Sequence, residues 1–278
     1  MEIGILTSPF RGETLEGVID FAAMNGFDAL EIAAGPGSPH LDPAALTDQR
    51  VAEIKALVSK SGVRISSFAQ YTNVTAPDPA KREQVGNDLK AAIDAAARLN
   101  VPMVCAMAGM PVPGKTKMET IEQDVAEVYP PILEYAAAKG VKIALENWYA
   151  TNIQHLGHWQ RIFEVLPQEN FGLNFDPSHL LWQGIDYIEA VDKFASRIFH
   201  THAKDTEVKD HMLRWVGNQE RGWWRYVIPG FGRVKWGEYI GALKAIGYND
   251  VLSIEHEDKA FGTEEGFIAG RNFLKQFV

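Results

Sequence analysis

Three carboxylates and one imidazole lie near the ends of four apolar runs in the second half of the chain. They are Glu146 in KIALENW, Asp176 in FGLNFDPSH, His202 in RIFHTHAKD and Glu255 in DVLSIEHED. Three carboxylates that converge without a counter-charge repel one another strongly, and a divalent cation between them removes that cost. Carboxylate oxygens with one imidazole suit Mn²⁺ best, with Mg²⁺ or Co²⁺ as alternatives and Zn²⁺ less suited. We therefore predict a divalent-metal site, provided that the fold brings the four residues together.

Alternating strand and helix patterns predict such a fold. A Gly or Asn followed by a short β-branched or aromatic run recurs along the chain, as in NGFDALEI and KGVKIALE. Apolar residues at three- and four-residue spacing predict helices between these runs. The runs predict strands near residues 2–8, 28–34, 63–70, 101–107, 142–147, 171–176, 198–203 and 250–255. This pattern indicates a (β/α)₈ TIM barrel that forms a single domain over residues 1–278, with a doubly wound open sheet as the alternative.

The alternation of side chains along each strand supports convergence of the four candidates. The residues two positions before them are small or polar, namely Ala144, Asn174, His200 and Ser253. The intervening positions, such as Leu145 and Ile254, are large and apolar and should face the helices. The candidates should then point inward at the carboxyl ends of the strands, where TIM-barrel active sites lie. In the last strand, the alternation also allows Glu257 in place of Glu255.

Composition limits the partners that we expect. Hydrophobic residues make up 46% and charged residues 23% of the chain, as in globular proteins. The net charge of −9 argues against a nucleic-acid partner. Cys105 is the only cysteine, which fits a reducing compartment, and the first ten residues look like a strand rather than a signal peptide. No apolar run approaches the roughly 18 residues of a membrane span. We therefore expect a cytoplasmic protein that binds neither nucleic acid nor a membrane.

The strand-end motifs LEN, NFDPSH, HAKD and IEHED, in this order, resemble those of the sugar isomerase/epimerase superfamily. That superfamily has a xylose isomerase-like barrel and includes ketose 3-epimerases, inosose-processing enzymes and endonuclease IV. The resemblance covers the whole chain. It implies that Glu146, Asp176, His202 and Glu255 are the metal ligands. It also implies that His179, three residues after Asp176, contacts the substrate.

The expected chemistry begins with loss of a proton next to a metal-chelated carbonyl, which gives an enediolate that the cation stabilises. Glu146 and Glu255 lie on strands separated by two others, so they could flank the substrate carbon, as the matching glutamates of the ketose epimerases do. Reprotonation would give an epimer or an isomer of a keto-sugar. Loss of a β-oxygen would instead make the enzyme a lyase or hydratase acting on a 3-keto-glycoside or keto-inositol.

Two positions depart from the ketose epimerase pattern. Asn152 stands where those enzymes carry a second glutamate, and Val208 stands where they carry an arginine. Lys209 or Arg214 would have to replace that arginine. A modified sugar therefore matches the sequence as well as a free hexulose does.

The stretch 206–235 is long for a connection between a strand and a helix, and such loops usually have a function. Its aromatic residues include Trp215, Trp223, Trp224 and Tyr226. It is interpreted either as a lid, in which Trp223 and Trp224 bind the substrate, or as a subunit contact of a homo-oligomer. Just before it, Lys204 could reach the substrate, or it could form a solvated ion pair with Asp205. The same pair could instead orient His202.

Two other classes of protein fit the sequence less well. A DNA-repair nuclease on the same barrel would need further histidines on early strands to hold three zinc ions, and the strand ends FAQY and VCAMAG supply none. The intact acidic cluster argues against a non-catalytic sugar-binding protein. We therefore expect an enzyme with a small carbohydrate substrate.

Overall fold

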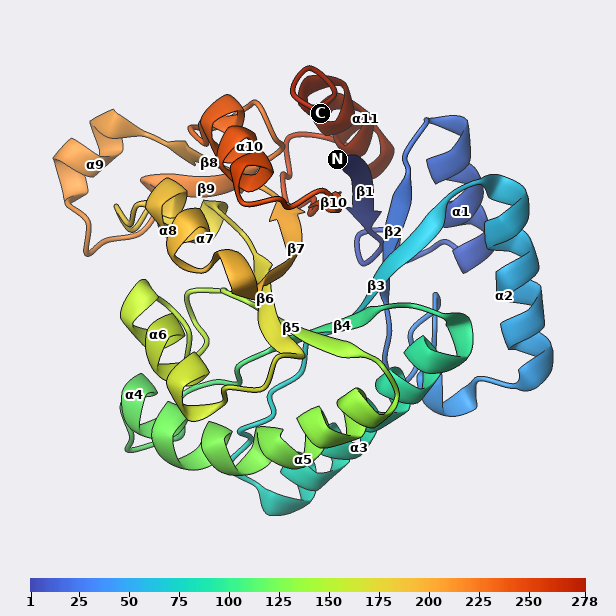
Figure 1. Cartoon of the computed structure of the whole chain (residues 1–278). Helices are drawn as coiled ribbons and strands as arrows, with labels where there is room; N and C mark the ends of the chain where they lie inside the picture. The colour runs from blue at the N-terminus through green and yellow to red at the C-terminus, as the bar shows by residue number, and fades with distance from the viewer.

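A closed barrel of eight parallel strands forms the centre of the computed structural model, which describes all of residues 1–278 (Figure 1). In order around the barrel, the strands are β1 (Glu2–Leu6), β10 (Val251–Ile254), β7 (Ile198–Ala203), β6 (Phe171–Phe175), β5 (Lys142–Glu146), β4 (Met103–Met107), β3 (Arg64–Gln70) and β2 (Ala29–Ala33). All eight predicted strands are present, with ends within two residues of the prediction. The closed order confirms the TIM barrel and excludes the open sheet.

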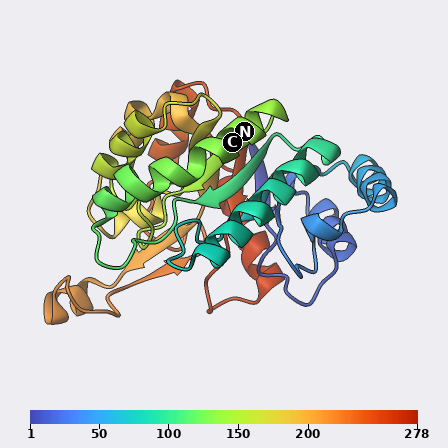
Figure 2. The same ribbon diagram turned by 90° about the horizontal axis from the view of Figure 1, so that it is seen from below.

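Helices surround the barrel on its outer side (Figures 1 and 2). They are α1 (Leu15–Met24), α2 (Asp48–Ser61), α3 (Pro79–Leu99), α4 (Lys117–Thr120), α5 (Ala126–Ala138), α6 (Leu156–Val165), α7 (Ser178–Leu181), α8 (Tyr187–Lys193), α9 (Asp210–Val216), α10 (Trp236–Ala245) and α11 (Thr263–Leu274). A π-helical turn, η2 (Ile121–Val125), joins α4 to α5, and the 3₁₀ turns are η1 (Pro43–Ala45) and η3 (Ala195–Arg197). None of the helices combines the length and the apolar character that crossing a membrane requires.

Local sequence signals set the helix limits, as α3 illustrates. The Asp78 side chain accepts hydrogen bonds from the backbone N–H groups of Ala80 and Lys81, and Pro79 occupies the first helical position. Asn100 ends the helix with a left-handed φ of 59°. These signals place the helix so that its buried side chains, such as Leu89 and Ile93, face the barrel.

The two faces of the barrel strands differ in character. Large apolar side chains on the outward face join one core of 64 buried residues between the strands and the helices. Several inward side chains are polar and fully buried, among them Glu31, Ser67, Asn174, His200 and Ser253. Buried polar groups need partners, so the inward face carries a hydrogen-bond network, and the proposed site lies at one end of it.

Residues Asp205–Val227 form an arm between β7 and the last barrel strand. The arm consists of β8 (Asp205–Val208), the helix α9, and β9 (Trp224–Val227), and the two strands pair antiparallel from Asp205 with Val227 to Val208 with Trp224. Figure 2 shows α9 projecting away from the barrel. The sequence interpretation of this stretch as a loop was therefore wrong in part. WRYV consists largely of good strand formers, and it pairs with the residues that directly follow β7.

Candidate metal centre and active site

The barrel brings the four predicted ligands together at the carboxyl ends of neighbouring strands. Glu146, Asp176, His202 and Glu255 each present an atom within 4.8 Å of the corresponding atoms of the others. His202 Nδ1 lies 3.1 Å from Glu255 Oε2, 3.7 Å from Glu146 Oε1 and 4.0 Å from Asp176 Oδ2. Of the two glutamates that strand alternation allowed on β10, Glu255 joins this cluster, whereas Glu257 lies half exposed at the rim.

The donor set fits a divalent cation. Asp176 Oδ2 and His202 Nδ1 are buried atoms without a hydrogen-bond partner, and both face the centre of the cluster. Unpartnered buried polar atoms are costly, and a shared cation would satisfy both. Three carboxylates and one imidazole nitrogen are also the ligand types that such a cation prefers.

Lys204 supplies a positive charge inside the same cluster. Its Nζ lies 2.6 Å from Glu255 Oε2, 3.2 Å from Asp176 Oδ2 and 4.0 Å from Glu146 Oε1. Burial would lower the pKa of Lys204, but Glu255 and Asp176 outweigh burial and raise it well above its usual value. The ammonium group therefore stays charged and offsets part of the carboxylate repulsion.

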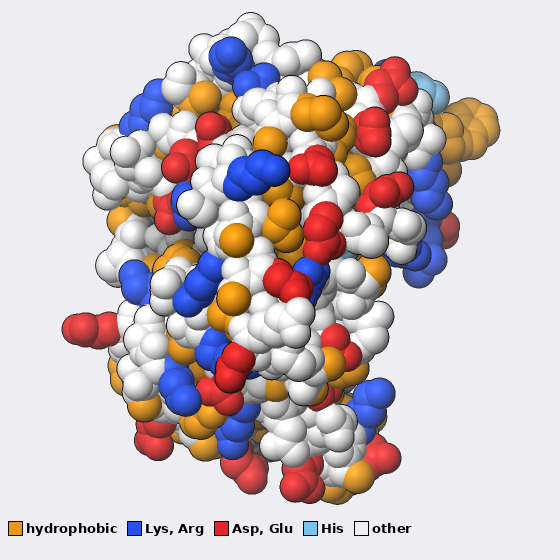
Figure 3. All heavy atoms as spheres, turned by 90° about the vertical axis from the view of Figure 1, so that its right-hand side faces the viewer, with side chains coloured by type: hydrophobic (Ala, Val, Ile, Leu, Met, Phe, Trp, Pro, Cys, Tyr) orange, Lys and Arg blue, Asp and Glu red, His pale blue; other side chains and the backbone are white.

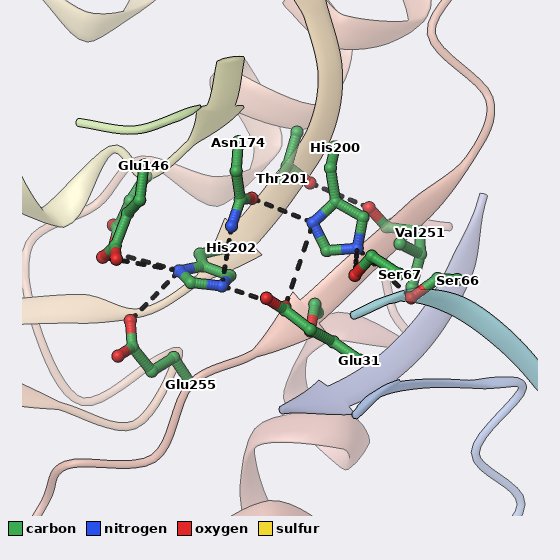
Figure 4. Close-up of polar contacts among 12 residues, drawn as sticks. Glu31, Ser66, Ser67, Glu146, Asn174, His200, Thr201, His202, Val251 and Glu255 are labelled. Carbon is green, nitrogen blue, oxygen red and sulfur yellow. Dashed lines mark hydrogen bonds and ion pairs between the residues drawn. The ribbon is translucent and has the colours of Figure 1, made fainter. Parts of the chain in front are cut away.

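A further carboxylate, that of Glu31 on β2, contacts His202 on the side opposite the cluster. Glu31 Oε2 lies 3.0 Å from His202 Nε2 and accepts a hydrogen bond from Ser253 Oγ at 2.9 Å. Glu31 Oε1 accepts a hydrogen bond from the Tyr71 hydroxyl at 2.6 Å. Figure 4 shows Glu31 on one side of the imidazole and Glu146 and Glu255 on the other. With the proton on Nε2 donated to Glu31, Nδ1 is left facing the three carboxylates.

Electrostatics keep Glu31 ionised in the barrel interior. Burial alone would raise the pKa of its carboxyl, but the nearby His202 and His200 outweigh burial and lower that pKa from 4.5 to about 2. His200 itself bonds to Asn174 Oδ1 at 2.9 Å and lies within 3.3 Å of the hydroxyl groups of Ser66 and Ser67. The support below the site is thus a connected set of buried polar groups, and the sequence predictions did not include Glu31 or Tyr71.

A cavity of about 490 Å³ opens above the cluster. Its walls are formed by Tyr71, Met107, Glu146, Trp148, Tyr149, His179, Lys204, Tyr226, Glu255 and Glu257. The aromatic rings of Trp148, Tyr149 and Tyr226 therefore lie in the same wall as the carboxylates of Glu146 and Glu255. The aromatic side chains of such a wall can pack against the apolar face of a sugar ring, while its polar side chains bind the hydroxyl groups of the ring.

His179, the residue expected to contact substrate, lies in this wall at the start of the short helix α7. Its Nε2 is 3.1 Å from Glu146 Oε1 and 3.3 Å from Lys204 Nζ, and its Nδ1 is 2.6 Å from the Tyr226 hydroxyl. When Nε2 carries the proton and donates to Glu146, Tyr226 donates to Nδ1. The arm thereby fixes the orientation of this imidazole.

Trp223 and Trp224 do not line the cavity, contrary to the interpretation of both as substrate-binding residues. Trp223 is buried, and Trp224 stacks on Trp182 with ring centroids 4.3 Å apart. Trp224 also packs edge-on against Tyr149 and lies 4.9 Å from the Tyr226 ring. The two tryptophans therefore form a second layer behind the aromatic wall, and neither is fully exposed to solvent.

Asp205 points away from Lys204 and holds the base of the arm. Its carboxylate accepts hydrogen bonds from the backbone N–H groups of Thr206, Gly230 and Val234 and from Trp236 Nε1. It therefore neither orients His202 nor forms an ion pair with Lys204, whose partners are the carboxylates of the cluster.

The positions that depart from the ketose epimerase pattern lie outside the cavity wall. The Asn152 side chain is buried and donates to the carbonyl of Ala108 at 2.9 Å. Val208 and Lys209 lie at the outer end of β8 and just beyond it, and Arg214 lies on the projecting helix α9. Neither Lys209 nor Arg214 replaces the arginine of those enzymes in the wall.

The chain matches the model of the xylose isomerase-like TIM barrel family over residues 19–277. It is 27% identical to the uncharacterized protein YfiH of Bacillus subtilis, with 100% of this chain and 99% of YfiH covered. It is 24% identical to an inosose isomerase of Halalkalibacterium halodurans, with 85% and 80% covered. The crystal structure of an IolI protein with a bound zinc atom superposes with a TM-score of 0.79 at 20% identity, covering 100% of this chain and 99% of that one.

Proposed function

Because the chain belongs to the xylose isomerase-like TIM barrel family, we propose that it is a divalent-metal-dependent enzyme that isomerises or epimerises a keto-sugar. The similarity to an inosose isomerase supports a substrate of the sugar or keto-inositol class. The buried cluster at the carboxyl ends of the strands, where TIM-barrel active sites lie, supports catalysis there.

One observation carries the proposal: two glutamates belong both to the cluster and to the cavity wall. The side chains of Glu146 and Glu255 are 8% and 13% exposed, whereas those of Asp176 and His202 are fully buried beneath them. Glu146 ends β5 and Glu255 follows β10, with β6 and β7 between these strands. Two carboxylates that approach one substrate carbon from different sides can remove a proton on one face and return it on the other.

The cation would be held by Glu146, Asp176, His202 and Glu255. Bound there, it would polarise a substrate carbonyl and make the proton on the adjacent carbon more acidic. The oxygen-rich donor set favours Mn²⁺, whereas the IolI structure contains zinc. Metal analysis of the purified protein would decide between them.

Glu31 would position the imidazole rather than touch the substrate. Its contact with Nε2 sets the tautomer in which His202 Nδ1 is free to bind the cation, and Ser253 and Tyr71 hold the carboxylate in place. Partners of this kind are typical behind metal-binding histidines.

Binding of the substrate would use the two contrasting sides of the cavity. The rings of Trp148, Tyr149 and Tyr226 offer a surface for the apolar face of a sugar ring. Lys204 offers N–H donors to its oxygens, and His179 would offer its Nε2–H in place of the contact with Glu146. The arrangement would bind a polar ring in one orientation, with its carbonyl toward the carboxylate cluster.

Solvent exchange tests the proposed proton transfer. Keto-inositols, free ketoses and 3-keto-glycosides would be incubated in D₂O with Mn²⁺, and deuterium uptake beside the carbonyl would be followed. Glu146→Gln and Glu255→Gln should each lower uptake at least about a hundredfold, as expected of a general base. Glu264→Gln, an exposed carboxylate at the start of α11, is the matched control and should leave uptake unchanged.

Analysis of the products separates the reaction classes. An epimer or isomer supports the proposal, whereas an unsaturated product that has lost a hydroxyl group identifies a lyase. Unchanged exchange in both glutamine variants, with metal still bound, would show that other residues handle the proton.

A further inference from the structure

A second cavity, of about 360 Å³, lies beside the proposed active site at the carboxyl ends of β1, β2 and β3. Residues 33–38 and 69–72 form its wall together with Ser8. Its volume is in the range of about 300–1,000 Å³ that small-molecule sites have. Tyr71 belongs to the walls of both cavities, and its hydroxyl group is held by Glu31 at 2.6 Å. Because the two cavities share this ring, a substrate in the first can extend past Tyr71 into the second.

The loop that follows β2 forms part of this wall without help from a ligand. Ser38 Oγ donates to the carbonyl of Ala33 at 2.7 Å, and the backbone N–H of Gly35 donates to the carbonyl of Leu41 at 3.0 Å. Gly35 also leaves room for Gln70, since a Cβ at this position would lie 2.9 Å from Gln70 Oε1. A wall held in this way is pre-organised, so little conformational freedom is lost when a ligand binds.

Two polar groups of the wall have no partner within the chain. Gln70 is only 2% exposed, and its Nε2 is buried without a hydrogen-bond partner. Thr72 Oγ1 is buried and unpartnered in the same stretch. Because unpaired buried polar atoms are costly, the cavity is suited to a ligand that brings hydroxyl groups to this stretch.

The wall of the second cavity carries no charge, which limits the chemistry of the ligand. None of its residues is acidic or basic, although charged residues make up 23% of the chain. Figure 3 shows the contrast on the outer surface over α1 and α2, where acidic and basic side chains are mixed. A phosphate group would find no cation among the residues of the wall. A neutral ring with hydroxyl groups matches their small apolar, amide and hydroxyl side chains.

We propose that the second cavity binds an uncharged sugar or polyol ring that is joined to the reacting keto-sugar, so that the substrate is a glycoside. This inference rests on the proposed function of the first cavity. The reacting ring lies over Glu146 and Glu255, and the linked ring passes Tyr71 to reach Gln70 and Thr72. Binding of the second ring then helps to hold the first ring in its reactive position.

Calorimetric titration with unoxidised sugars in the presence of Mg²⁺ tests the second cavity without requiring turnover. At least one of trehalose and cellobiose should bind at least about tenfold more tightly than methyl α-glucoside or methyl β-glucoside, respectively, because the added ring makes contacts of its own. Gln70→Leu should reduce this ratio of affinities about three- to tenfold, as expected for loss of a hydrogen bond. Ser8→Trp, which adds a bulky side chain to the wall, should remove the preference. Gln84→Leu, on the exposed side of α3, is the matched control and should keep it.

The titrations have clear contrary outcomes. Equal affinities for each disaccharide and its methyl glycoside in the wild type would overturn the inference. A preference that Gln70→Leu and Ser8→Trp both leave intact would also overturn it, provided that circular dichroism shows both variants to be folded. Tighter binding of glucose 6-phosphate than of the methyl glucosides would indicate a charged ligand and would likewise overturn it.

Deuterium exchange separates this inference from the proposed function. Among the 3-keto derivatives of the same sugars, the preferred disaccharide should show a higher kcat/KM for exchange than its methyl glycoside. A disaccharide that binds more tightly, when no keto-sugar exchanges, would overturn the proposed function alone. Exchange that is equally fast for disaccharides and methyl glycosides would support the proposed function and overturn the inference.

Discussion

Glu31 on β2 and His202 on β7 face each other inside the barrel, with Glu31 Oε2 3.0 Å from His202 Nε2. The contact joins strands that lie 171 residues apart in the chain. It leaves the other imidazole nitrogen facing three carboxylates, and so links the buried polar network to the proposed metal centre.

Replacing Glu31 by Gln should weaken binding of the divalent cation. The variant removes the charge behind His202 and allows its ring to take the other tautomer, so affinity for Mn²⁺ should fall about 10- to 100-fold. Calorimetric titration of the metal-free protein measures this change directly. Ser66→Ala is the control, because Ser66 contacts His200 rather than His202. If Glu31→Gln bound Mn²⁺ as tightly as the wild type, Glu31 would not orient His202 for metal binding. Glu31→Asp, which keeps the negative charge, should recover part of the lost affinity.

Replacing Lys204 by Met should strengthen binding of the divalent cation. Its Nζ is 2.6 Å from Glu255 Oε2, so the ammonium group competes with a cation for the same oxygens. Removal of this buried positive charge should raise affinity for Mn²⁺ at least about tenfold. The same titration measures it, with the exposed Lys259→Met as control. If Lys204→Met bound Mn²⁺ more weakly than the wild type, the ammonium group of Lys204 would not compete with the cation.

Replacing Tyr226 by Phe should disturb His179 without changing metal affinity. The hydroxyl group is 2.6 Å from His179 Nδ1, and its loss frees the imidazole to reorient. Deuterium exchange into a responsive keto-sugar should slow about tenfold, equivalent to about 1.4 kcal/mol in the barrier. Tyr135→Phe, which removes a hydroxyl group bonded to Asp94, should leave exchange unchanged. An undiminished rate in Tyr226→Phe would show that the arm does not orient His179.

Stability at acidic pH should depend on His158. Burial, followed by the nearby charges of His155 and Lys117, lowers its pKa from 6.5 to about 4. Between these values the folded protein binds fewer protons than the unfolded chain, so this contribution to stability is complete above pH 6.5 and is lost as the pH falls toward 4. His158→Leu should remove it, and Leu is tolerable there because Nδ1 has no hydrogen-bond partner.

Urea unfolding at about pH 4.5 and about pH 7.5 tests the His158 prediction. The loss of unfolding free energy on acidification should be smaller in the variant by about 1–3 kcal/mol, since one pKa unit corresponds to about 1.4 kcal/mol. The same loss in both proteins would show that His158 does not titrate differently on unfolding.

The barrel and the acidic cluster could be predicted because their signals are local and repeated. Several strands are short apolar runs that follow a helix-ending residue, as in NGFDALEI and KGVKIALE, and alternation along a strand states which side chains share a face. Glu31 carried a usable signal, since it is the only charged residue in ALEIA. Its partner could not be read from the sequence, because pairing across a barrel depends on register and closure.

The arm was harder to predict for a different reason. WRYV has strand character, but its partner is the segment that directly follows His202 and Lys204, which the motif HAKD had already assigned to the site. The positions of Trp223 and Trp224 depend on the path of that hairpin. The sequence indicated a lid or a subunit contact for this stretch, and only the fold shows that Trp223 is buried and that Trp224 packs against Tyr149 and Tyr226.

The hydrogen bonds of Asp205 at the base of the arm bear on how the length and sequence of the arm can change. One carboxylate ties the start of the excursion to Gly230, Val234 and Trp236, where the chain returns toward the barrel. Segments between these anchor points could lengthen, shorten or be exchanged while the proposed ligands His202 and Glu255 keep their places. The arm is therefore a segment that evolution or an engineer could exchange to give the same carboxylate cluster a different cavity wall.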